Sequence, residues 1–136
     1  MPDQHLALAG TWVTETQENL EELLVALKVG FIVRKAATKA SPKQTISFDG
    51  MSMTIETVTP IKTTKNTIPL DGTAFTDNVM GNDFTGTITI KEDGAIFTEG
   101  TMPMGKLTTH RQVVDGKMVL ITEIGDVKCT RVFKRA

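Results

Sequence analysis

Four Asp-Gly pairs recur along the chain at a constant spacing of 22 residues, and this regularity constrains the fold more than any other feature of the sequence. The pairs are Asp49-Gly50, Asp71-Gly72, Asp93-Gly94 and Asp115-Gly116. Asp-Gly supplies the positive φ angles that tight hairpin turns need. Further turn signals lie between the pairs, at Thr63 to Asn66, Gly81-Asn82-Asp83, Pro103-Met104-Gly105 and Gly125-Asp126. Each interval therefore predicts two strands of ordinary length in an antiparallel meander, although one of the four pairs could be accidental.

The segments between these turns are rich in Thr, Val, Ile and Phe, which favour strands. The predicted strands cover about residues 11–16, 43–49, 52–59, 61–69, 73–77, 84–91, 95–102, 106–114, 117–124 and 127–134. Ten short strands in one domain must protect their edges, and closing the sheet into a barrel is the most complete way to do so. We therefore expect an all-β fold, a ten-stranded barrel formed by residues 1–136 as a single domain.

One region departs from the strand pattern. Its leucines recur at i, i+3, i+4 and i+7, as Leu20, Leu23, Leu24 and Leu27, which predicts a helix with one apolar stripe. Asn19 is the expected N-cap, with Glu22 as its capping-box partner. Gly30 interrupts, and a second helical stretch runs from about residue 31 to 40. Two such short helices cannot fill a barrel, so residues 19–40 are predicted to form a helix–turn–helix lid over its mouth, between the first two strands.

The final predicted strand places an arginine on an apolar face. Because strand side chains alternate, one face carries Val127, Cys129, Arg131 and Phe133. Arginine keeps its charge in proteins, so it is costly to point inward without a partner.

The same pattern occurs in the strand over 106–114, where Arg111 shares a face with Leu107, Thr109 and Val113. A strand with Met118, Leu120, Thr122 and Ile124 on one face lies between the two in sequence. Two arginines would then point into one interior. Each could instead reach the rim or pair with a surface carboxylate, but an anion supplied from outside the protein would satisfy both.

Composition excludes several classes of function. The chain has 15 basic and 16 acidic residues, so no overall field draws it to nucleic acid. Its single cysteine, Cys129, fits a reducing compartment, and His5 and His110 are isolated, so we expect no metal and no cofactor. No secretory signal, membrane-spanning run, nucleophile–base pair or nucleotide-binding loop is evident. We expect a cytoplasmic monomer without enzymatic activity, a location that leaves nuclear entry open.

The sequence resembles the intracellular lipid-binding proteins, the family of fatty-acid-binding and cellular retinoid-binding proteins, over nearly its whole length. The residues that carry the resemblance are Gly10-Thr11-Trp12, ENLEELL (18–24), VGFIVRKAA (29–37) followed by Pro42, VDGKMV (114–119) and CTRVF (129–133). The resemblance implies an antiparallel up-and-down barrel of two near-orthogonal sheets, closed by the helical lid, with one hydrophobic ligand in an internal cavity.

In that family two arginines and a tyrosine meet the ligand carboxylate, in an Arg-x-Tyr arrangement near the C-terminus. Arg111 and Arg131 match the arginines, whereas Phe133 stands in place of the tyrosine. The chain is similar to the branch that carries phenylalanine there, which implies that Arg111 matters first and Arg131 second. The retinol binders carry glutamines at the arginine positions, so a carboxylate is favoured over an alcohol. Phe133, Leu120 and Thr122 are expected to line the cavity.

The family's ligand entrance lies beside the second helix, and Leu24, Val29 and Ile61 match its apolar portal positions, with Leu20 just inside. These residues could equally serve only to pack the helical lid onto the barrel. The lid also carries Lys28, Arg34, Lys35 and Lys39, which form either a solvated charged face or a surface that docks on anionic membranes.

The favoured function is intracellular binding and transport of a long-chain fatty acid or a similar hydrophobic carboxylate. Retinoic-acid binding in the same cavity is the alternative within the fold. A third hypothesis is a lipid-delivery or interaction module that acts through the basic lid.

Overall fold

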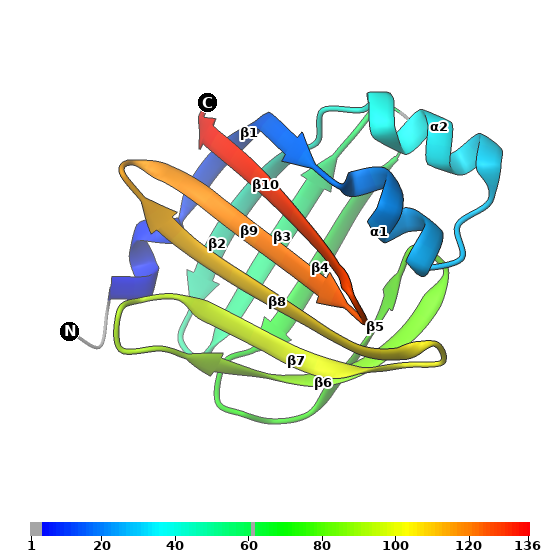
Figure 1. Cartoon of the computed structure of the whole chain (residues 1–136). Coiled ribbons are helices and arrows are strands. Elements are labelled where there is room, and N and C mark those ends of the chain that lie inside the picture. The colour runs from blue at the N-terminus through cyan, green and yellow to red at the C-terminus, as the bar shows by residue number, and fades with distance from the viewer. Residues whose placement is uncertain (1–3, 61) are drawn as a thin grey trace.

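Ten antiparallel strands surround one interior in the computed structural model, which describes residues 4–60 and 62–136 (Figure 1). The strands are β1 (Gly10–Glu18), β2 (Lys43–Asp49), β3 (Ser52–Val58), β4 (Thr63–Pro69), β5 (Phe75–Val79), β6 (Asn82–Ile90), β7 (Ile96–Met102), β8 (Gly105–Val114), β9 (Lys117–Ile124) and β10 (Val127–Arg135). A short 3₁₀ helix η1 (Gln4–Leu8) precedes β1, and helices α1 (Leu20–Ala26) and α2 (Phe31–Lys39) connect β1 to β2. The predicted all-β architecture with a helical lid between the first two strands is confirmed.

The strands form one hydrogen-bonded ladder in the order β4-β3-β2-β1-β10-β9-β8-β7-β6-β5. Strands adjacent in sequence are adjacent in the ladder, except β4 and β5, and the pairing of β1 with β10 joins the first and last strands of the chain. β2, β3 and β4 cross behind β8, β9 and β10, as Figure 1 shows, so the two layers face each other. The barrel is nearly closed, and its opening lies between β4 and β5, the two ends of the ladder.

The Asp-Gly pairs behave in two ways. Asp115 and Gly116 form a two-residue turn with φ angles of 53° and 78°, the conformation that joins hairpin strands of ordinary twist. Asp71-Gly72 instead connects β4 to β5, which do not pair with each other, so the meander prediction is wrong at this one position. There the Asp71 carboxylate accepts a hydrogen bond from the backbone N–H of Thr73, a local turn that needs no partner strand.

The hairpin of β5 and β6 turns earlier than the sequence suggested. Met80 and Gly81 occupy the turn with positive φ angles, so Asn82 belongs to β6 and not to the loop. The side chain of Asn78 accepts a hydrogen bond from the N–H of Gly81 and fixes this turn. Asn82 is then free to donate from Nδ2 to the carbonyl of Leu27 at 2.8 Å. The hairpin is thereby attached to the end of α1.

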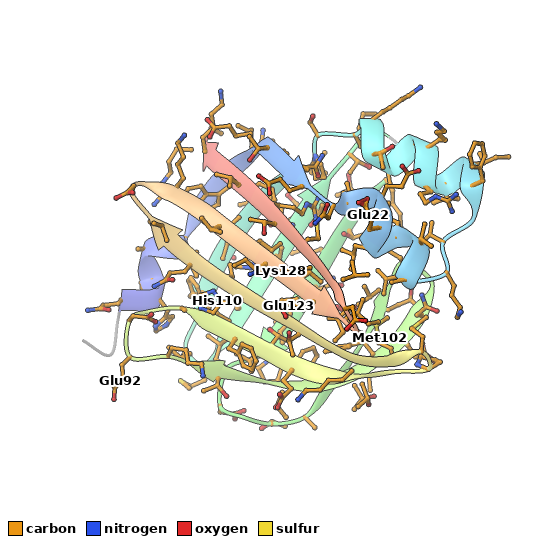
Figure 2. All side chains as sticks on the ribbon, in the orientation of Figure 1. Glu22, Glu92, Met102, His110, Glu123 and Lys128 are labelled. Carbon is orange, nitrogen blue, oxygen red and sulfur yellow. The ribbon has the colours of Figure 1, made fainter. Side chains whose placement is uncertain are left out.

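The apolar stripe of α1 packs onto the barrel as predicted, with Leu23, Leu24 and Leu27 buried. The predicted capping box is wrong. Asn19 adopts a left-handed conformation with φ of 61°, and its side chain makes no cap hydrogen bond. It donates instead to the carbonyl of Lys128 on β10, 109 residues away in the chain. Glu22, labelled in Figure 2, is exposed. Tertiary contact, and not local capping, therefore sets where α1 begins.

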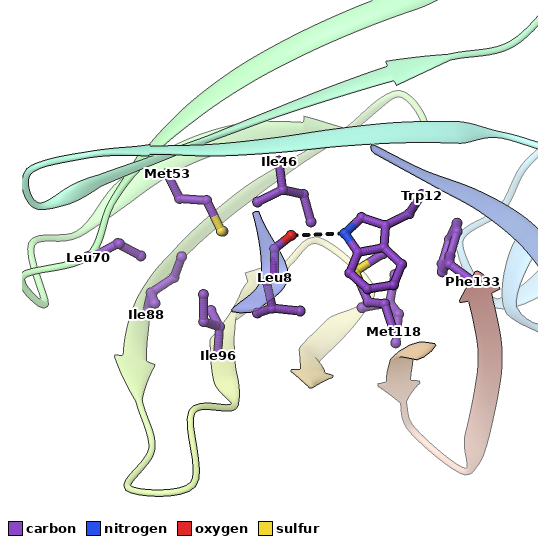
Figure 3. Close-up of a cluster of buried hydrophobic side chains, with 10 residues drawn as sticks. Leu8, Trp12, Ile46, Met53, Leu70, Ile88, Ile96, Met118 and Phe133 are labelled. Carbon is purple, nitrogen blue, oxygen red and sulfur yellow. Dashed lines mark hydrogen bonds between the residues drawn. The ribbon is translucent and has the colours of Figure 1, made fainter. Parts of the chain in front are cut away.

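Two apolar clusters occupy the interior. The closed-end cluster, drawn in Figure 3, consists of Leu8, Trp12, Ile46, Met53, Leu70, Ile88, Ile96, Met118, Leu120 and Phe133. Within it the indole N–H of Trp12 donates to the carbonyl of Leu8 at 2.9 Å, which fixes η1 against the barrel. The lid cluster consists of Leu23, Leu24, Leu27, Val29, Phe84, Met102, Leu107, Ile124 and Cys129. None of the described helices is long and apolar enough to cross a membrane.

Candidate functional site: two inward-facing arginines

Strand register brings the two predicted arginines onto one inner face. Arg111 on β8 and Arg131 on β10 both pair with Leu120 on β9, which lies between them. The residues that alternate with Arg111, Leu120 and Arg131 along the three strands face outward. Two of them, Glu123 and Lys128, are exposed and pair with each other across β9 and β10 (Figure 2). The prediction that both arginines share an inner face on second-neighbour strands is confirmed.

Arg111 is buried, with 9% of its surface exposed. Its Nη1 donates to Oε1 of Gln44 at 2.8 Å and contacts Sδ of Met118 at 3.4 Å. Because β2 and β8 are not neighbours in the ladder, the hydrogen bond to Gln44 spans the interior from one layer to the other. Burial, followed by the positive charge of Arg131, lowers the pKa of Arg111 to about 10.

Arg131 is half-buried, and its Nε donates to Oε1 of Gln17 at 3.1 Å. The two residues face each other directly in the β1–β10 register. The guanidinium also lies over the ring of Phe133, with 5.6 Å between Cζ and the ring centroid. Burial lowers the pKa of this arginine too.

Neither guanidinium has a carboxylate within 4.0 Å among residues 4–60 and 62–136. The alternatives of a rim position or a surface ion pair therefore fail for Arg111. An interior with two cations and only neutral partners is chemically suited to an anion, because charge-assisted hydrogen bonds are about twice as strong as neutral ones.

The three residues predicted to line a cavity are all buried on the inner face. Phe133 is fully buried in the closed-end cluster beside Trp12 and Met118 (Figure 3). Leu120 is 5% exposed and Thr122 is 9% exposed, the latter pairing with Cys129 under the lid. Their role toward a ligand stays a prediction.

Sequence reasoning missed Gln17 and Gln44. Alternation along 43–49 places Gln44 on the same face as Ile46 and Phe48, which marks it as an inward-facing polar residue. Its partner could not be found from the pattern, because Arg111 lies 67 residues away on the opposite layer.

The predicted portal residues lie at the lid. Leu24 and Val29 are buried in the lid cluster, and Leu20 is half-buried against it. Ile61 lies outside the described residues. Their arrangement is compatible with lid packing, and their function as an entrance stays a prediction.

The four basic residues of the lid differ in their surroundings. Arg34 donates from Nη1 to the carbonyl of Val29 at 2.9 Å, and its Nε lies 3.6 Å from the carboxylate of Glu21, so it links α2 to α1. Lys28, Lys35 and Lys39 are exposed. Sequence reasoning overlooked the exposed apolar residues beside them, which are Val25, Phe31, Ile32 and Val33.

Two open hollows lie on the outer surface near β5 to β7, with volumes of about 360 and 490 Å³. Their walls are mainly exposed threonines and charged residues, such as Thr85, Glu99 and Lys106. Neither arginine of the site lines them, and their lining residues include no large apolar side chain.

Comparison with known proteins places these features in a family. No family model matches the chain. Sodium/calcium exchanger regulatory protein 1 of Doryteuthis pealeii is 38% identical over 94% of this chain and 96% of its own. Fatty acid-binding protein 9 of Homo sapiens is 34% identical over 93% of this chain and 95% of its own. The solved structure of the REP1-NXSQ fatty acid transporter superposes with a TM-score of 0.90 at 35% identity, covering 96% of this chain and 97% of that one.

The ten-stranded barrel, the helical lid and the inward-facing arginines define a small β-barrel binding protein. With relatives above 30% identity along almost its full length, the chain belongs to the intracellular lipid-binding protein family, the fatty-acid-binding and retinoid-binding proteins. That family consists of lipid-binding carriers.

Proposed function

We propose that this protein binds a long-chain fatty acid or a similar hydrophobic carboxylate between the two layers of its barrel and carries it in the cytoplasm, without catalysing a reaction. The observation that supports this most is the pair of inward-facing guanidiniums, Arg111 and Arg131, with neutral partners. The names of the human relative and the solved transporter favour a fatty acid over retinoic acid.

In this proposal the acyl chain and the head group contribute differently. Burial of an acyl chain gives about 0.8 kcal/mol per CH₂, on the order of 10 kcal/mol for a long chain before ordering costs. One charged hydrogen bond adds about 1.5–3 kcal/mol. The chain therefore sets most of the affinity, and the arginines set the orientation and the choice of head group. Arg111 carries the larger share because it is the more deeply buried of the two.

Two measurements test the proposal. Native mass spectrometry of protein purified from its source, followed by extraction, should identify a bound hydrophobic carboxylate. Delipidated protein should then bind a long-chain fatty acid at least ten-fold more tightly than the alcohol of the same chain length. Equal affinity for acid and alcohol would show that the arginines do not select a carboxylate.

The proposal includes transfer of the ligand at anionic membranes through the lid. Ile32 is 83% exposed and Phe31 is 61% exposed on α2, beside the exposed Lys28, Lys35 and Lys39. Apolar side chains flanked by lysines are typical of segments that rest on an anionic lipid surface. We also propose that Leu20, Leu24 and Val29 border the path by which the ligand enters.

Ile32→Ser tests the lid. Transfer of a fluorescent fatty acid to vesicles containing phosphatidylserine should slow several-fold, and transfer from the native protein should slow as salt is raised. Val114→Ser is the matched control, because Val114 is 45% exposed in the β8–β9 region, away from the lid. Equal rates for both variants would remove the lid from the transfer step. Sedimentation should give a monomer throughout.

A further inference from the structure

Two glutamines hold the two arginines of the interior. Gln44 on β2 is 6% exposed and accepts from Arg111, and Gln17 on β1 accepts from Arg131. In each pair the acceptor is an amide oxygen, which carries no formal charge. Both glutamines therefore aim a guanidinium without neutralising it.

The two acceptors are neutral although a negatively charged side chain would fit at the same positions. Glutamate has the same length and shape as glutamine, and its carboxylate would lie at the distance that the Gln44 oxygen now occupies, 2.8 Å from Nη1 of Arg111. Such an ion pair would relieve the buried charge of the ligand-free protein. The chain instead leaves both charges without a counter-ion among its described residues.

Gln44 is itself held in place on both sides. It pairs with Trp12 on β1 and with Thr57 on β3, and its Nε2 lies 3.5 Å from the hydroxyl of Thr57. Among the described residues, Arg111 forms side-chain hydrogen bonds only through Nη1. Its other two nitrogens, Nε and Nη2, form no such bond to the described residues, and neither of them is sealed off from solvent. Those two nitrogens remain available as donors while Gln44 fixes the plane of the guanidinium.

We propose that Gln17 and Gln44 determine specificity, by orienting Arg131 and Arg111 with neutral acceptors so that the positive charge of the interior is kept for the carboxylate of the ligand. This inference rests on the proposed function and names the residues that make the barrel select an acid. A glutamate at either position would supply the anion internally and repel the one that the ligand brings.

Gln44→Glu tests the proposal directly, with binding measured for a fatty acid and for its matched alcohol. We expect affinity for the acid to fall between about 10-fold and 100-fold, the value of one charged hydrogen bond, and affinity for the alcohol to stay within about three-fold. Gln17→Glu should give a smaller loss, because Arg131 is only half-buried. Retained binding of the alcohol shows that the variant is folded.

Two controls separate charge from structure. Gln44→Met removes the acceptor without adding charge, so Arg111 loses its orientation but keeps its charge, and this variant should lose part of the preference for the acid, clearly less than Gln44→Glu loses. Gln112→Glu adds the same charge on β8, beside Arg111 in sequence but on the outer face, and should leave both affinities unchanged. Loss of the acid preference in Gln44→Met as large as in Gln44→Glu would overturn the proposal.

The proposed function and this inference fail in different ways. If the native protein itself binds acid and alcohol equally, the carboxylate function is wrong. If the native protein prefers the acid and Gln44→Glu binds it as tightly as before, the function stands and the role of Gln44 is wrong.

Discussion

Replacing Arg111 by glutamine should make the ligand-free protein more stable while making it a poorer binder of fatty acid. Among the residues that the structure describes, the buried guanidinium has a single polar partner of good geometry, the neutral Gln44. Its pKa is lowered from the ordinary value to about 10, with burial as the main cause. A depressed pKa on a cationic group means that folding disfavours the charged form, so the charge opposes folding at neutral pH.

The size of the effect follows from the pKa. At 1.36 kcal/mol per pKa unit, the depression corresponds to roughly 3 kcal/mol of lost stability, an upper limit for the gain on removing the charge. Shortening the side chain leaves some space unfilled, which offsets the gain by about 1 kcal/mol. We therefore expect a net gain of about 1–2 kcal/mol, or a rise in Tm of several degrees.

The pH dependence has a definite sign. Arg111 stays charged in the folded protein below pH 10, so the full penalty is present there and is relieved only as pH rises through about 10. The stability difference between the native protein and Arg111→Gln should therefore be constant across neutral pH. Urea denaturation of delipidated samples measures it, and a fluorescent displacement assay measures binding of acid and alcohol.

The two assays must agree for the reasoning to hold. Affinity for the acid should fall at least ten-fold and affinity for the alcohol should not fall. A ligand-free variant that is less stable than the native protein would mean that the guanidinium contributes to folding, and its burial would then need no ligand to explain it. Phe133→Leu is the comparison for ordinary core damage, since Phe133 is fully buried and should cost at least 1 kcal/mol.

Three further predictions concern other parts of the barrel. Arg131→Gln should weaken acid binding less than the Arg111 variant does, because its guanidinium is only half-buried; an equal or larger loss in the displacement assay would contradict this ranking. Asn82→Ala removes the hydrogen bond to Leu27 and should cost about 1 kcal/mol, with faster ligand dissociation in stopped flow and no change in head-group selectivity. Cys129 is fully buried and burial raises its pKa, so labelling by a thiol reagent at neutral pH should be slow in the native protein and fast in urea, whereas rapid native labelling would show that the lid cluster opens readily.

The sequence predicted the structural features that follow from the alternation of side chains along a strand and from the residues that form turns. Arg111, Leu120 and Arg131 could be placed in one row because the period of a strand is two and the connecting turns are short. The opening between β4 and β5 could not be predicted, since Asp71-Gly72 has the same letters as the pairs that form hairpins. Whether such a pair closes a hairpin depends on the pairing of the whole ladder and not on the turn itself.

The remaining differences arise from contacts between distant residues. The residues next to Asn19 in sequence predict that it caps the helix, but its side chain donates a hydrogen bond to a backbone carbonyl of β10. Arg111 and Gln44 meet only because β2 and β8 face each other across the barrel. No local pattern contains either pair, so these partners follow from the closed topology and become visible only with it.

The closed end of the barrel explains how the fold tolerates an uncompensated charge. Trp12, Met118 and Phe133 are each completely buried, and full burial of a large apolar side chain stabilises a protein by about 1.5–3 kcal/mol. Met118 contacts Arg111 directly, so the closed-end cluster packs against the buried guanidinium. The burial of each of these side chains is of the same order as the roughly 3 kcal/mol that Arg111 costs. Apolar burial beside Arg111 therefore stabilises the fold around the charge, and the lid cluster adds a second set of buried apolar residues.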